Sequence, residues 1–222
     1  MSEVCVTTGG AIDDHGPLAH QFEDLEQQRE ADELGMWLFL ATEVMFFGGM
    51  FLAYIIYRMQ NEAGFAAGSH HLDATLGGIN TAVLLSSSLS MALAVHAAQH
   101  SRRGALVVLL GLTMVLGCVF LGIKFYEYHH KYEEQLVPGM AAYWRLGNNY
   151  ERIFLNLYFV MTGVHAVHMV IGIGMLITLL VIALRGGMTG PRSTPVHMVG
   201  LYWHFVDIVW VYLFPFLYLV SS

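Results

Sequence analysis

Charged residues are scarce in this sequence. Only 12% of its 222 residues are Asp, Glu, Lys or Arg, whereas 56% are hydrophobic. A soluble domain carries about 25% charged residues, so this chain has too little charge to cover a water-facing surface. The high hydrophobic content also excludes a disordered chain. Both observations predict a membrane protein.

Cysteine and clustered basic residues are also lacking. The two cysteines, Cys5 and Cys118, cannot form a disulfide framework, and the sequence has no CxxC or CxxCH motif for zinc or covalent haem. No basic patch could neutralise a row of phosphates, which argues against nucleic-acid binding. The polar, acidic start of the chain is unlike a secretory signal, which needs a basic segment and an early apolar stretch.

The net charge of −7 is concentrated at the N-terminus. Residues 1–33 hold nine acidic residues and one basic residue, whereas the remainder holds eight acidic and nine basic residues. We therefore divide the chain into an acidic tail, 1–33, and an apolar body, 34–222. In the tail, Leu18, Phe22 and Leu25 recur at helical spacing. This spacing fits either a short amphipathic helix on a membrane or partner, or chance in a solvated segment.

Long apolar runs make up the body. A membrane-spanning helix needs about 20 mostly apolar residues, and five runs meet that length, at about 34–57, 76–99, 104–126, 153–184 and 198–220. The runs are continuous rather than alternating, and they are too long for membrane strands. The sequence therefore predicts an all-α membrane protein, a bundle of five transmembrane helices. Arginines in two connecting loops favour a cytoplasmic N-terminus and an outer C-terminus, namely Arg102, Arg103, Arg185 and Arg192.

Glu43 lies well inside the first predicted span, about 13 Å from its start at 1.5 Å per residue. A lone carboxylate there costs about 3 kcal/mol or more, so it must be protonated, paired or close to water. We interpret Glu43 as a residue of a proton pathway or a lipid cleft. A structural hydrogen bond to a neighbouring helix is the alternative.

Histidines and small polar residues occur in three of the spans. His165 and His168 share one helix face, His96 lies in the second span, and His204 precedes Asp207 by one helical turn. They could form a polar network with a His204–Asp207 hydrogen bond, or supply axial haem ligands. The second span also carries small residues at four-residue spacing, which predicts close helix packing rather than a catalytic serine: Ser86, Ser90 and Ala94.

Four segments together resemble subunit III of the haem-copper oxidases. They are WLFLATEVMFFGGMFLAYIIY (37–57), GIKFYEYHH (122–130), TGVHAVHMVIG (162–172) and LYWHFVDIVWVYLF (201–214). The resemblance implies an all-helical, noncatalytic subunit with no cofactor or metal of its own. It implies packing beside subunits I and II, which would hold haem and copper, together with support of proton uptake and binding of phospholipid.

The resemblance also assigns individual residues. Glu43 matches the family's buried carboxylate, and Glu127 matches an acid at the end of the corresponding helix. Lys124 stands where the family often has an acid. The chain lacks the first two helices of seven-helix members, as shorter bacterial members do. The two signature elements are matched by His165, His168, Trp203, His204 and Asp207.

We therefore predict a noncatalytic subunit of a proton-translocating cytochrome c oxidase, active in respiratory electron transport in a bacterial cell membrane. One alternative is an accessory subunit of a quinol oxidase or nitric-oxide reductase. Another is a haem-b anchor that uses histidines from the set His96, His165, His168 and His204. A transporter is disfavoured because no inverted repeat is visible. The acidic tail lies outside the resemblance and is the predicted contact with a neighbouring subunit or a further respiratory complex.

Overall fold

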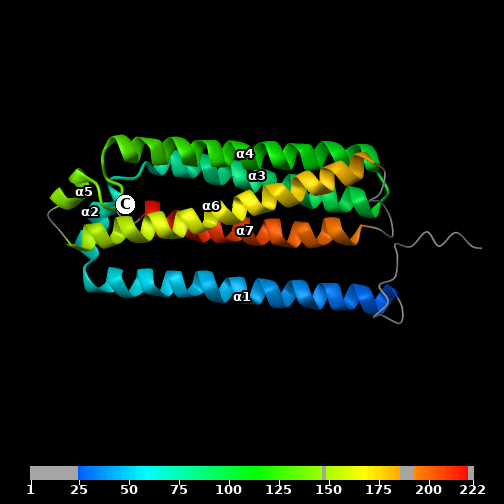
Figure 1. The fold of residues 1–222 in the computed structure, drawn as a ribbon, viewed down its shortest axis with the longest axis horizontal. Coiled ribbons are helices and arrows are strands. Elements are labelled where there is room, and N and C mark those ends of the chain that lie inside the picture. The colour runs from blue at the N-terminus through cyan, green and yellow to red at the C-terminus, as the bar shows by residue number, and fades with distance from the viewer. Residues whose placement is uncertain (1–24, 147–148, 186–192, 220–222) are drawn as a thin grey trace, which may run out of the picture.

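The computed structural model describes residues 25–146, 149–185 and 193–219. Within these ranges the chain forms helices only, and the long ones run side by side along the long axis (Figure 1). The two short helices, α2 and α5, lie at the same end of this bundle (Figure 1). The helices are α1 (Leu25–Gln60), α2 (Glu62–Ser69), α3 (Ala74–Gln99), α4 (Arg103–Glu133), α5 (Ala141–Arg145), α6 (Asn149–Leu184) and α7 (Thr194–Tyr218).

Five of these helices are long and apolar enough to cross a membrane: α1, α3, α4, α6 and α7. Four of them contain a predicted apolar run completely, and α7 contains the fifth run as far as Tyr218, which confirms the five-span, all-α prediction. Several helices are longer than their runs, because polar residues also suit helix ends. Glu26 lies in the first turn of α1 and Lys131 in the last turn of α4, where the helix dipole favours their charges.

The last residues of the predicted acidic tail are helical. Helix α1 begins at Leu25, so residues 25–33 of the predicted tail are helical and continuous with the first span. The charged residues of this segment do not interrupt the helix. Residues 1–24, including Leu18 and Phe22 of the predicted amphipathic repeat, lie outside the described residues.

Short turns fix how the spans follow one another. Asp73 precedes α3, and its Oδ1 accepts hydrogen bonds from the backbone N–H groups of Thr75 and Leu76 at 2.8 and 3.3 Å. This is a helix N-cap, which starts α3 directly after α2. Ser101, with φ 55°, makes the tight turn from α3 to α4, so these two helices are antiparallel neighbours.

Helices α3, α4, α6 and α7 pack closely, whereas α1 contacts α6 and α7 less extensively. Trp203 of α7 is completely buried between glycines of two other helices. A Cβ atom on Gly117 of α4 would lie 2.8 Å from its indole ring, and one on Gly172 of α6 would lie 3.0 Å from it. These glycines allow the helices to approach the ring.

The small residues of α3 are used in part as predicted. Ser90 and Ala94 are buried, and the Ser90 hydroxyl lies 2.6 Å from the Thr113 hydroxyl of α4. Ser86 is instead exposed, and it donates to its own helix at the Ala82 carbonyl. Ser87, the next residue, takes the buried position and accepts a hydrogen bond from Trp203 Nε1 at 3.0 Å.

Candidate functional site

Glu43 and His168 form a polar contact between α1 and α6. Glu43 Oε2 lies 3.1 Å from His168 Nε2, and the two side chains are 18% and 14% exposed. Phe47 packs edge-on against the imidazole ring at 5.2 Å. The carboxylate in the first span therefore has a partner on a neighbouring helix, as the cost of burying it requires.

The second ring nitrogen of His168 limits the protonation states that this contact can have. Nδ1 is 2.9 Å from the Val164 carbonyl oxygen, and a carbonyl can only accept a hydrogen bond, so Nδ1 carries a hydrogen. The Glu43–His168 contact then needs one further proton. It lies either on Nε2, giving an imidazolium–carboxylate pair, or on the carboxyl group, which donates to Nε2.

An apolar groove lies beside this contact, between α1 and α7. Its volume is about 540 Å³, and its walls include Trp37, Phe47, Phe51 and Tyr212, with His204 at one side. The lining is almost entirely apolar. Such a surface suits a hydrocarbon chain rather than a polar ligand.

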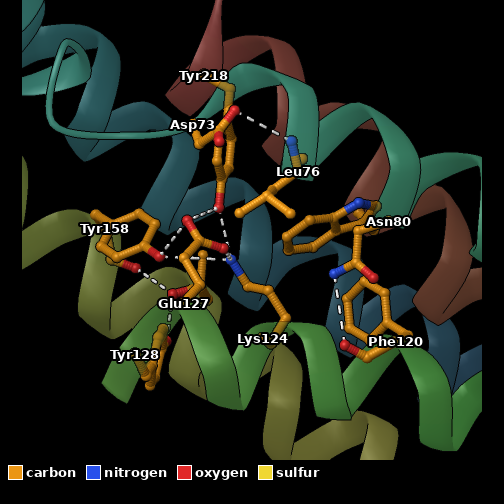
Figure 2. Close-up of polar contacts among 12 residues, drawn as sticks. Asp73, Leu76, Asn80, Phe120, Lys124, Glu127, Tyr128, Tyr158 and Tyr218 are labelled. Carbon is orange, nitrogen blue, oxygen red and sulfur yellow. Dashed lines mark hydrogen bonds and ion pairs between the residues drawn. The ribbon is translucent and has the colours of Figure 1, made fainter. Parts of the chain in front are cut away.

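Lys124 and Glu127 form a second charged cluster, buried among α4, α6 and α7 (Figure 2). Lys124 Nζ donates to Glu127 Oε2 at 2.8 Å and to the Tyr218 hydroxyl oxygen at 2.6 Å. The hydroxyls of Tyr158 and Tyr218 donate to Glu127 Oε1 at 3.0 and 2.6 Å. Both charged side chains are only 6% exposed.

Aromatic rings enclose the Lys124 ammonium. Its Nζ lies 4.8 Å from the Trp210 ring centre and 5.2 to 5.8 Å from the rings of Tyr218, Tyr158 and Tyr128. Cation–π attraction and a paired carboxylate together stabilise a desolvated charge. The sequence signal for this cluster was a Lys and a Glu three residues apart at the end of an apolar run. The two tyrosines that complete it, from α6 and α7, could not be assigned from spacing.

The residues of the two signature elements do not form one network. His168 pairs with Glu43, whereas His165 is fully buried between the rings of Phe120 and Trp210. The predicted His204–Asp207 hydrogen bond is not formed. His204 Nδ1 lies 2.7 Å from the Ser88 hydroxyl of α3, while Asp207 is buried and has no hydrogen-bond partner among the described residues. His204 therefore bonds to a residue of a neighbouring helix rather than to one of its own helix.

The histidines considered for haem point to different neighbours. His96 is exposed and its ring lies 4.1 Å from that of His100, and His168 and His204 have the partners described above. Among the described residues, no group of three His, Cys, Asp or Glu side chains is arranged to hold a metal ion.

Comparisons with known proteins agree with this architecture. The family model described as cytochrome c oxidase subunit III matches residues 25–222. The chain is 31% identical over 215 residues to cytochrome c oxidase subunit 3 of Alkalihalophilus pseudofirmus, covering 96% of this chain and 98% of the relative. It is 30% identical over 188 residues to cytochrome bo(3) ubiquinol oxidase subunit 3 of Pseudomonas aeruginosa, covering 85% and 84%.

A third relative is the quinol oxidase subunit 3 of Bacillus spizizenii, 29% identical over 209 residues, with 94% of this chain and 96% of the relative covered. The matches therefore extend over nearly the whole length of chains from both cytochrome c and quinol oxidases. The family match begins at Leu25, the first residue of α1. With five membrane-spanning helices and this match, the chain belongs to the cytochrome c oxidase subunit III family, the multi-pass membrane subunit III of haem-copper respiratory oxidases.

Proposed function

We propose that this chain is a noncatalytic subunit that packs beside subunits I and II of its oxidase and supports proton uptake, stability and lipid binding there. Haem and copper would lie in the partner subunits. The observation that carries the proposal is the Glu43–His168 contact, 3.1 Å long and within two membrane-spanning helices. Glu43 and His168 would hold one exchangeable proton between them near the proton entrance of the complex.

The role that we propose for Glu127 differs from that of Glu43. Its carboxylate is neutralised by Lys124 and accepts from two tyrosines, so a proton arriving there would have to break an existing ion pair. We assign Glu127 to the stability of the bundle rather than to proton transfer. His165 and Trp203 act with it in packing α6 and α7.

The α1–α7 groove is the proposed lipid site of this five-helix form. A phospholipid acyl chain would lie along Phe47, Phe51 and Tyr212, with water excluded from that face of the Glu43–His168 contact. We propose further that the N-terminus is cytoplasmic in a bacterial cell membrane. The arginines of the turn between α3 and α4 would then lie on the cytoplasmic side.

The relatives belong to oxidases with different electron donors, since they include subunits of both cytochrome c and quinol oxidases. We propose the cytochrome c branch and keep the quinol branch as the second candidate, which the relative from Pseudomonas aeruginosa favours. Turnover of the purified complex with reduced cytochrome c and with ubiquinol decides between them. Oxidation of ubiquinol alone would refute the first proposal.

The proton proposal is tested by Glu43→Gln in the assembled oxidase. The amide preserves the shape and can still bond His168, but it cannot give up a proton. We expect slower steady-state turnover, a shorter active lifetime and a lower proton stoichiometry, most clearly at alkaline pH where protons are scarce. Ser86→Ala, at an exposed position on α3, is the matched control. If all three quantities stay at the wild-type level in Glu43→Gln, the proton role is wrong.

A further inference from the structure

Basic side chains gather at the end of the bundle where α1 begins. The α3–α4 turn, the end of α6 and the start of α7 lie at this same end (Figure 1). Five of these side chains are exposed and the sixth is half-buried. We call this surface the basic end and define it by its arginines and histidines, His96, His100, Arg102, Arg103, Arg185 and His197.

The helices that carry the basic end supply no carboxylate to it. The sequence has no Asp or Glu in residues 74–126, which include α3 and most of α4, or in residues 152–206, which include most of α6 and the start of α7. Arg103 donates to the backbone carbonyl oxygens of Ala183 and Leu184 in the last turn of α6. Within the described ranges no arginine forms an ion pair. The positive charge of Arg102 and Arg185 is therefore not compensated by these four helices.

The segment that precedes α1 has the complementary charge. Residues 1–24 contain no Lys or Arg and have five carboxylates, those of Glu3, Asp13, Asp14, Glu23 and Asp24. They are joined to the first residue of α1, at the end of the bundle that carries the basic end. The first turns of α1 are themselves acidic, with four carboxylates and one arginine in residues 26–33. Because like charges repel, residues 1–24 gain more from the basic end than from lying along α1.

The tether is long enough to bring these carboxylates to the arginines. About 11 residues separate Asp14 from Leu25, and an extended chain of that length spans up to roughly 36 Å. Helix α1 contacts α6 and α7, and these contact α4 and α3. Two helix spacings of about 10 Å therefore separate α1 from Arg102. Single ion pairs at an exposed surface are weak, but a short tether gives an effective concentration on the order of millimolar, which favours a contact made by several such pairs.

We propose that residues 1–24 dock on the basic end of their own bundle, with Asp13 and Asp14 against Arg102 and Arg185. The occupant is a segment of the same chain because its tether begins at this end of the bundle. The contact weakens as salt shortens the Debye length from about 8 Å at physiological ionic strength. A docked segment keeps an outer side that faces away from the bundle, so the contact predicted between the tail and a neighbouring subunit is compatible with this arrangement.

The test measures how often the segment lies at the basic end in the assembled oxidase, held in nanodiscs of zwitterionic lipid. Cys5→Ser and Cys118→Ser remove the native thiols of this chain, and Ile12→Cys and Gln99→Cys place new ones beside Asp13 and at the exposed end of α3. The rate of disulfide formation between them is followed by mass spectrometry of the linked peptides. We expect rapid linkage within one chain, slowed in salt of about 0.5 M.

Reversing the charges shows whether the contact is the proposed one. Arg102→Glu with Arg185→Glu should slow the linkage about fivefold, because each exposed ion pair changes such an equilibrium by about two- to fivefold. Asp13→Lys with Asp14→Lys should slow it equally, and the four changes together should restore it. Arg58→Glu, in the last turn of α1 at the opposite end of the bundle, is the matched control and should leave the rate unchanged.

Linkage that does not change when either set of charges is reversed would overturn the proposal, as would the absence of any linkage to the end of α3. A disulfide formed between two copies of the chain, or between the segment and another subunit instead of α3, would identify a different occupant and also overturn it. If the arginine variants do not assemble, Asp13→Lys with Asp14→Lys decides the outcome, because these changes lie outside the helices of the bundle.

Discussion

The Lys124–Glu127 cluster allows a double-mutant test of what a buried ion pair contributes to this bundle. The two side chains are 6% exposed and are joined at 2.8 Å. We consider Lys124→Met, which preserves length without charge, and Glu127→Gln, which preserves shape and an oxygen acceptor. Each single change leaves the other charge buried without its counter-charge.

The expected sizes follow from these contacts. Breaking a buried ion pair by removing one partner costs about 3–5 kcal/mol, so either single variant should lose that much stability. Glu127→Gln leaves the ammonium among aromatic rings, with hydroxyl oxygens as its acceptors. In the double variant no charge is buried, and the new amide oxygen still accepts from Tyr158 and Tyr218. We expect it to lie within about 1–2 kcal/mol of the wild type, because uncharged replacements of buried pairs are often close to neutral.

The assay is reversible unfolding of the chain in mixed micelles, together with its retention in the purified oxidase. The free energies should be strongly non-additive, with the double variant more stable than either single variant. Glu133→Gln is the control, because its pair with His129 is 3.7 Å long and more than half exposed, and it should change stability by less than about 0.5 kcal/mol. Additive losses, or single losses under about 1 kcal/mol, would refute the reasoning.

Three further outcomes are expected. Gly117→Ala should destabilise the bundle by about 1–3 kcal/mol in the same unfolding assay, because the added Cβ would lie 2.8 Å from the buried Trp203 ring. Ser87→Ala should cost about 1–3 kcal/mol by removing the acceptor of Trp203 Nε1, whereas Ser86→Ala should be neutral. Deletion of residues 1–24 should leave α1 intact but reduce co-purification with a neighbouring subunit or respiratory complex; unchanged co-purification would contradict that use of the segment.

The spans could be predicted because one physical requirement, a long apolar run, determines them. Helix ends could not, since they depend on caps and dipoles rather than on hydropathy. Glu26 and the residues around it read as a polar tail, yet they continue α1 without interruption. The same limit applies to α4, which extends past Tyr126 to Glu133.

Burial cost predicted which residues need a partner, but not which partner they find. Glu43 was expected to need one and contacts His168 on α6. His204 was expected to bond Asp207 on its own helix and instead bonds Ser88 on α3. Spacing along one helix determines which residues share a face, whereas the contact itself depends on how two helices rotate against each other. For the same reason the serine buried beside Ser90 proved to be Ser87 rather than Ser86.

Glu43 and Glu127 differ in the number of hydrogen bonds that a change in the charge of the carboxyl group would disturb. Glu127 accepts from an ammonium and two phenols and sits among closely packed helices, so changing its charge would disturb three hydrogen bonds at once. Glu43 has one imidazole partner, and it lies on α1, the span that contacts the rest of the bundle least extensively. The proposed movement of a proton within the Glu43–His168 contact would involve only this contact and the His168–Val164 hydrogen bond. If Glu43 gains and loses a proton as proposed, its place on the loosely packed α1 means that the change would disturb few other contacts.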